Sequence, residues 1–331
     1  MQQSALTHLL AFLGSLKLAL AGMLLLLLLI LYDLEVADLS PVWLAACLGL
    51  LFLNLLAAVA VRPQFRRQPG LLVFHLCLAA VAGLSALQVL TVLEARVELA
   101  ENQAFSVADV EILKRGPWHT GRLDQVGFTQ GPVRVEYRPD LRRGSTHSTI
   151  YIDSQEPRQP LVFGDNRSFN SDGYRFITTP NKGWSVTLNW IAEDGQRAAG
   201  NIHMPSYPAQ EWDQRQQWRT LSGEDVSLYL DLSPVSAGRD WTLSSDSFNG
   251  ALRLIRADGS EYVLVKGQAV LLTGGSLELV DVGLWMGYRI EYNRVLPWLF
   301  AAAALGVAAL GWHFWANPPH FRPAAGITDV A

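Results

Sequence analysis

Long apolar runs alternate with short polar ones through the first third of the chain, and one more apolar run follows near the end. Four runs are almost without charged residues: 18–32, 42–61, 71–93 and 295–315. The last three have about 20 residues, which is the length that a helix needs to cross the core of a bilayer. The first reaches this length when it begins near Ser15, because the amine of Lys17 can extend to the lipid headgroups. The sequence therefore predicts four transmembrane helices, at about 15–33, 41–62, 70–93 and 294–316.

The charges of the short loops predict the orientation of these helices. The loop RPQFRRQPG between the second and third runs contains three arginines and no acid, whereas the loop DLEVADLSP between the first and second contains three acids and no base. Basic short loops stay on the cytoplasmic side of a membrane. We therefore expect both ends of the chain in the cytoplasm, including a tail at 317–331, and residues 94–293 on the outer side of a bacterial inner (plasma) membrane.

Residues 94–293 follow a different pattern, in which apolar and polar positions alternate over short segments such as PVRVEYRP, WSVTLNWI and DVSLYLDL. Turn signals separate the segments, among them Asp194-Gly195 and Asp258-Gly259. A period of two residues is typical of strands with one buried face. Because no helical segments alternate with these strands, we do not expect a nucleotide-binding α/β fold. The predicted fold class is a membrane protein with four transmembrane α-helices and one large all-β, sandwich-like extracytoplasmic domain, preceded by an N-terminal membrane region at 1–93.

Charge and motif content limit the chemistry of the outer domain. It carries more acids than bases, in a chain of formal net charge −4, so no nucleic-acid partner is expected. It has no paired-histidine metal motif, nucleophile elbow or phosphate-binding loop, and we expect His119, His147 and His203 to be surface or edge residues. The two cysteines, Cys47 and Cys77, fall in predicted helices at different depths, so no disulfide is expected. The outer domain then has no thiol for redox exchange.

One ionisable side chain, His75, interrupts the third apolar run, GLLVFHLCLAAVAGLSALQVL, close to its cytoplasmic end. Ionisable residues in membrane spans are costly and usually face a bundle interior or a cavity. The small residues that follow it, which include Ala79 and Gly83, allow a close approach by something flat or by another backbone. One interpretation is a hydrogen bond to a neighbouring helix. The other is axial ligation of haem iron by the imidazole, with the porphyrin against the apolar wall.

A second axial ligand could come from His313, which lies near the cytoplasmic end of the last run. The aromatic residues around it, in GWHFWANPP, are also typical of an interfacial belt. A ligand from another subunit is the stronger hypothesis, and His313 stays a weak candidate.

Several segments resemble the ResB family of cytochrome c biogenesis proteins. They are SLKLAL in the first span, NLL followed by the arginines after the second, and the histidine within GLLVFHLCLAAVAG. The stretches GPVRVEYRPDLRRGSTHSTIYID and DVGLWMGYRIEYNR in the outer domain are looser similarities. The chain is short for this family, and Ala57 and Ala58 stand where many relatives have a cysteine.

The resemblance implies a subunit that helps carry haem b across the membrane, or present it or apocytochrome c for covalent attachment, together with a tryptophan-rich ResC-type membrane protein. It implies His75 as one axial ligand of that haem, with Ala79 and Gly83 making room for the porphyrin or the partner helix. Such a subunit would not be catalytic by itself. Two alternatives remain: a haem b electron-transfer subunit that uses His75 and His313, and a cofactor-free membrane scaffold that presents a β-domain.

Overall fold

The computed structural model describes residues 2–36, 39–140, 142–153, 159–208, 213–232 and 239–316. The cytoplasmic tail predicted at 317–331 lies outside these residues. The chain divides into two compact units. One, which we call the helical unit, comprises Met1–Val92, Arg115–Thr120 and Asn293–Ala331, and the other, the β unit, comprises Leu93–Lys114 and Gly121–Tyr292.

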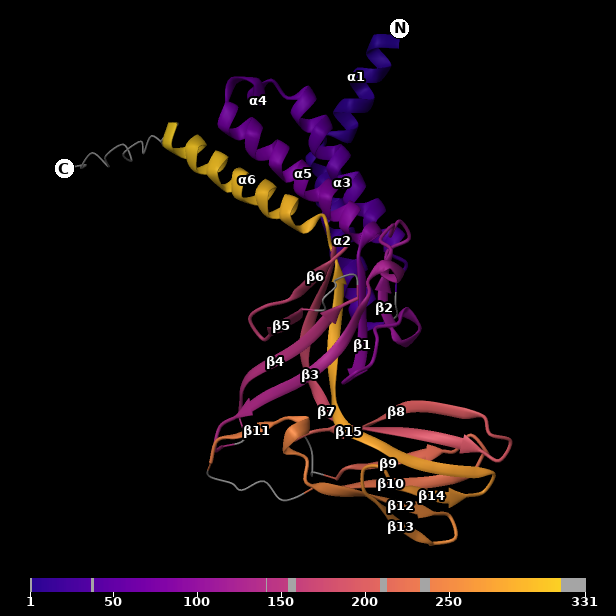
Figure 1. Ribbon diagram of the computed structural model, residues 1–331. Helices are drawn as coiled ribbons and strands as arrows, with labels where there is room; N and C mark the ends of the chain where they lie inside the picture. Colours follow the sequence, from indigo (N-terminus) through magenta and orange to yellow (C-terminus); the bar gives the residue numbers. More distant parts are fainter. Residues whose placement is uncertain are drawn as a thin grey trace, which may run out of the picture. The chain divides into compact units, whose positions relative to one another are not determined.

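Within the described residues the helical unit has six helices (Figure 1): α1 Gln2–Leu13, α2 Leu16–Glu35, α3 Pro41–Val61, α4 Pro63–Arg67, α5 Pro69–Thr91 and α6 Leu296–Ala316. Helices α2, α3, α5 and α6 are long and apolar enough to cross a membrane. Many of their leucines are exposed, as expected for side chains that contact lipid. The four predicted spans are thus present as helices, whereas the short α1 and α4 were not predicted.

Small residues let the long helices pack closely. A Cβ atom at Gly14 would lie 2.8 Å from the backbone of Ala58 on α3, and one at Gly22 would lie 2.9 Å from Leu51. A Cβ atom at Gly306 of α6 would lie 3.1 Å from Cys77 of α5. Close approach at small residues is the usual basis of helix association in lipid, where no hydrophobic effect drives helices together.

The β unit is built from antiparallel strands, as the alternating pattern predicts. Its strands are β1 Leu93–Ala100, β2 Glu111–Arg115, β3 Phe128–Tyr137, β4 Arg143–Ile152, β5 Pro160–Gly164, β6 Phe169–Ser171, β7 Tyr174–Ala192, β8 Arg197–Ser206, β9 Arg215–Arg219, β10 Asp225–Leu232, β11 Trp241–Leu243, β12 Gly250–Arg256, β13 Glu261–Leu264, β14 Ala269–Leu272 and β15 Gly275–Tyr292. The described part of the unit forms a seven-stranded sheet around β15 and β7 and two four-stranded sheets, β13-β12-β10-β9 and β11-β3-β4-β5.

The long pair β7 and β15 connects the two ends of the β unit (Figure 1). At one end β15 pairs with β1, from Tyr292 opposite Leu93 to Trp285 opposite Ala100. At the other end it pairs with β14, and β7 pairs with β8. Buried and exposed positions alternate along β1, and its buried residues join one apolar cluster with side chains from all three sheets. This continuous core makes the β unit one domain.

Candidate functional site

His75 lies in the second turn of α5, and a local hydrogen bond selects the tautomer of its neutral ring. The imidazole Nδ1 is 2.8 Å from the carbonyl oxygen of Leu71, one turn earlier. A carbonyl oxygen can only accept, so Nδ1 carries the proton of the neutral ring. The lone pair of the neutral imidazole is then on Nε2, which is the form that binds a metal.

The aromatic residues beside His75 come from the turn that precedes α5. The prolines Pro63 and Pro69 begin α4 and α5, and the residues before them cannot continue a helix, so the chain reverses within a few residues. This turn buries Phe65 of α4, whose ring centroid lies 4.5 Å from that of His75. The ring of Phe74 lies edge-on to the imidazole at 5.4 Å. Phe65 is a site residue that the sequence analysis missed, although its position inside a basic loop is unusual for a large apolar side chain.

His313 does not lie beside His75. On α5 the positions closest to α6 include Gly70, where an added Cβ would lie 2.9 Å from the Cβ of His313, and Cys77, which faces Gly306. At about 100° per residue, His75 is about 140° from Gly70 and about 160° from Cys77 around the helix axis. Its imidazole therefore points away from α6, and the structure does not bring the two histidines together.

Ala79 and Gly83 follow His75 along the helix and are covered by the chain itself. Ala79 is 1% exposed. A Cβ atom at Gly83 would lie 3.1 Å from the ring of Phe52 on α3, so this glycine makes room for an aromatic side chain of the same chain. Gly83 thus serves the packing of α3 against α5, and Ala79 is buried within the helical unit.

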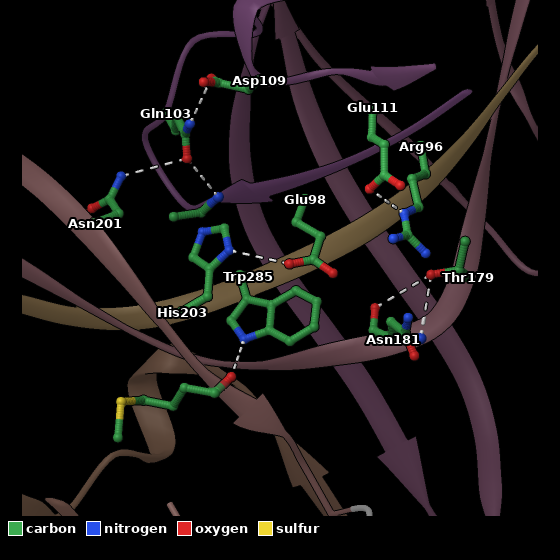
Figure 2. A network of polar contacts seen from close by, with 12 residues as sticks. Arg96, Glu98, Gln103, Asp109, Glu111, Thr179, Asn181, Asn201, His203 and Trp285 are labelled. Carbon is green, nitrogen blue, oxygen red and sulfur yellow. Dashed lines mark hydrogen bonds and ion pairs between the residues drawn. The ribbon is translucent and has the colours of Figure 1, made fainter. Parts of the chain in front are cut away.

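A second candidate site is a polar cavity of about 750 Å³ in the β unit, which the sequence analysis did not predict. There His203 of β8 stacks on the indole of Trp285 of β15, with ring centroids 5.4 Å apart, and its Nδ1 lies 3.5 Å from Glu98 of β1 (Figure 2). The indole N–H of Trp285 donates to the carbonyl of Met204 at 2.9 Å. The cavity is lined by Arg96, Val97, Glu98, Gln103, Asp109, Glu111, Ala199, Gly200, Asn201 and His203.

The charged groups of this cavity largely pair with one another. The guanidinium of Arg96 donates to Glu111 at 2.7 Å, and the amide of Gln103 donates to Asp109 at 3.1 Å (Figure 2). In the described part of the chain, no three His, Cys, Asp or Glu side chains are grouped as they would be to hold a metal ion. The cavity can offer hydrogen bonds to a polar ligand, but its side chains are already engaged in stabilising the strands that line it.

The other two histidines between α5 and α6 have separate roles. The Nδ1 of His119 lies 3.0 Å from the carbonyl of Thr91, at the end of α5. His147 is exposed on β4, with its Nε2 3.2 Å from the hydroxyl of Ser145. Neither is among the residues that line the cavity.

No protein-family model and no curated protein matches the sequence. Among solved structures, a protein described as cytochrome c heme lyase CcmF is similar over 93% of this chain and 38% of its own, with a TM-score of 0.30 and 14% identity. The chain therefore spans well under half the length of that protein. A likeness this weak establishes neither a shared fold nor a shared function.

Proposed function

We propose that this chain is a ResB-like, non-catalytic subunit of a cytochrome c biogenesis complex, in which haem is the cargo and His75 is one ligand of its iron. The observation that carries the proposal is the hydrogen bond from His75 Nδ1 to the carbonyl of Leu71. It leaves the lone pair on Nε2, as an axial ligand requires, inside a helix of membrane-spanning length.

The second ligand of the haem comes from a partner in this proposal. His313 lies on the side of α5 away from the imidazole of His75, so a pair of ligands from this chain is not favoured. Ala79 and Gly83 lie one and two turns after His75 on the same face of α5, and the chain itself covers them, with Phe52 of α3 against Gly83. The porphyrin would therefore lie closer to the start of α5, on the side where Phe65 and His75 meet. A tryptophan-rich ResC-type membrane protein is the partner that we propose for that side.

The β unit would hold the apocytochrome or the partner rather than act on thiols. Both cysteines of the chain are buried in α3 and α5, so the β unit has none to exchange with a Cys-x-x-Cys-His motif. Its open polar cavity offers hydrogen bonds and carboxylates, which suit a polar or basic peptide segment.

An absorption spectrum of the purified chain tests the proposal. The full chain is purified alone and together with a ResC-type partner, as wild type, as His75→Ala and as His313→Ala. We expect a reduced haem spectrum with the partner, lost in His75→Ala and kept in His313→Ala. Haem in the isolated chain that needs both histidines would instead favour electron transfer. If no sample contained haem while every variant was stably expressed, both haem-binding functions would be refuted. The cofactor-free membrane scaffold would then be the remaining alternative.

A further inference from the structure

A short loop from the outer segment is attached to the end of a transmembrane helix. Residues Arg115–Thr120, with the sequence RGPWHT, lie within the outer segment along the chain but belong to the helical unit. The backbone N–H of Gly116 donates to the carbonyl of Val92 at 2.8 Å, and that of Trp118 donates to the carbonyl of Leu90 at 2.8 Å. The ring Nδ1 of His119 donates to the carbonyl between them, that of Thr91, at 3.0 Å.

These three bonds satisfy groups that a helix cannot satisfy by itself. The last carbonyls of an α-helix have no partner within the helix, and near a membrane an unpaired carbonyl is costly. The loop therefore caps α5, and it does so at short range, because a Cβ atom at Gly116 would overlap the carbonyl group of Leu90. The position of the loop is consequently fixed by the end of the span.

The cap leaves the side chain of Trp118 without cover, with 61% of the residue exposed. Its neighbours Pro117 and Arg115 are exposed as well. A second exposed tryptophan, Trp43, lies at the same level of the helical unit. Phe52 of α3 packs against Gly83 of α5, and the two helices run antiparallel. Trp43 lies as many residues before Phe52 as Val92 lies after Gly83, so Trp43 is at the level where α5 ends.

We propose that the Arg115–Thr120 loop is an interfacial membrane anchor, in which Trp118 inserts at the boundary between headgroups and acyl chains on the side where α5 ends. Tryptophan is enriched at this depth because its ring is apolar while its N–H can bond to water or headgroups. Arg115 at the start of the loop is exposed, and its guanidinium can pair with lipid phosphate. One exposed aromatic ring among polar residues fits a lipid boundary better than a protein interface, whose centre normally gathers several buried anchors.

Depth-dependent quenching tests this anchor in the full chain. Cys47 and Cys77 are replaced by alanine, and a single cysteine is introduced as Trp118→Cys, labelled with an environment-sensitive fluorophore and reconstituted in vesicles of neutral and anionic lipid. Trp43→Cys is the matched interfacial control, and Leu271→Cys, at a position 80% exposed on β14, is the control in the β unit. Circular dichroism and size-exclusion profiles identify variants that fail to fold, in which case Thr120→Cys is labelled instead.

We expect the label at 118 to be quenched by spin-labelled lipids as strongly as the label at 43, with a maximum for the spin label nearest the headgroup. Quenching by aqueous iodide and not by lipid would overturn the proposal, since the loop would then be in water. Shielding from both quenchers would also overturn it, because a protein surface would then cover the tryptophan.

Discussion

A buried amide, Asn54, joins three helices at the scale of a single residue. Its Nδ2 donates to the carbonyl of Leu13 at 2.5 Å and to that of Ser15 at 3.1 Å, where the chain passes from α1 to α2. Gly14 lies between these carbonyls, directly against the backbone of α3. The amide thus satisfies the Leu13 carbonyl, which the break between the two helices leaves unpaired, and is a second donor to the Ser15 carbonyl, which also accepts from the backbone N–H of Ala19.

We predict that Asn54→Leu destabilises the helical unit by about 1–2 kcal/mol, because the Leu13 carbonyl loses its donor while the number and branching of the side-chain heavy atoms stay the same. The measurement is the thermal midpoint of the full chain in detergent, followed by size exclusion. Leu53→Ala is the matched control, since Leu53 is 53% exposed on the same helix. Equal effects of the two substitutions would mean that the amide adds nothing beyond packing.

A buried lysine in the β unit makes stability depend on pH. Lys182 of β7 is 4% exposed, and its amine donates to the carbonyl of Pro180 at 3.2 Å. Burial, and to a smaller extent the charge of Arg143, lower the pKa of this amine from 10.5 to about 8, against a smaller opposing effect of Asp165. Between these two pKa values the unfolded chain binds more protons than the folded chain, so stability rises with pH there. Burial of Tyr207 raises its pKa to about 12, so near pH 10 tyrosine ionisation in the unfolded chain reverses the trend.

We expect the unfolding midpoint of the wild-type chain to rise from pH 8 to about pH 10. In Lys182→Met this rise should largely vanish, and the variant should be more stable at pH 7 by about 1–3 kcal/mol, because no charge is then buried. The control is Lys266→Met, an exposed lysine paired with Asp281, which should leave the pH dependence unchanged. A wild-type curve that is flat over this range would show that the amine of Lys182 is hydrated.

At the scale of helices, α5 lies between α3 and α6 and packs against both. It contacts α6 through Gly70 and Cys77 on one side and α3 through Gly83 on another. The interface with α6 can be tested with a native cysteine, because Cys77 lies opposite Gly306 at a distance suitable for a disulfide after a small adjustment.

We predict that Gly306→Cys forms a disulfide with Cys77 on mild oxidation in the membrane. Gly311→Cys is the matched control, since nothing lies within 4 Å of the Cβ position at Gly311. Mass spectrometry after maleimide treatment counts the remaining thiols. Oxidation should remove two thiols in the first variant and none in the second, and similar losses in both would refute the helix register.

Helix α5 also shows where prediction from sequence ends. Its length and apolar composition mark it as a span, and the histidine within it is visible in the sequence. The neighbours of that histidine cannot be identified from the sequence, because Phe65 reaches it through a turn made by two prolines. The side of the helix that meets α6 cannot be identified either, since it depends on contacts at Gly70 and Cys77. A period of 3.6 residues does not identify a neighbour when the helix is apolar all round.

At the scale of the whole molecule, hydropathy and alternation predicted four membrane-length helices and a β-rich domain of antiparallel sheets, and the structure has both. The attachment of Arg115–Thr120 to α5 was not predictable, because its bonds join residues distant in sequence. The same holds for the cavity in which His203 meets Glu98 and Trp285, since each of these residues comes from a different strand.

The orientation of the chain in the membrane remains a prediction from its loop charges. We expect Leu271→Cys in the β unit to react with a membrane-impermeant maleimide in intact cells, and Gln64→Cys in α4 to react only after permeabilisation. Both variants are made in the chain with its two native cysteines replaced by alanine. Labelling of Gln64→Cys in intact cells would reverse the orientation.

Chemical rescue of His75 tests the central claim, that this imidazole binds haem iron, most directly. The variant His75→Gly is purified with the ResC-type partner, and its haem spectrum is recorded with and without added imidazole. We predict loss of the wild-type spectrum in the variant and its return with imidazole, because the free ring can occupy the space left by the side chain. A variant that kept the wild-type haem spectrum without imidazole would contradict the account.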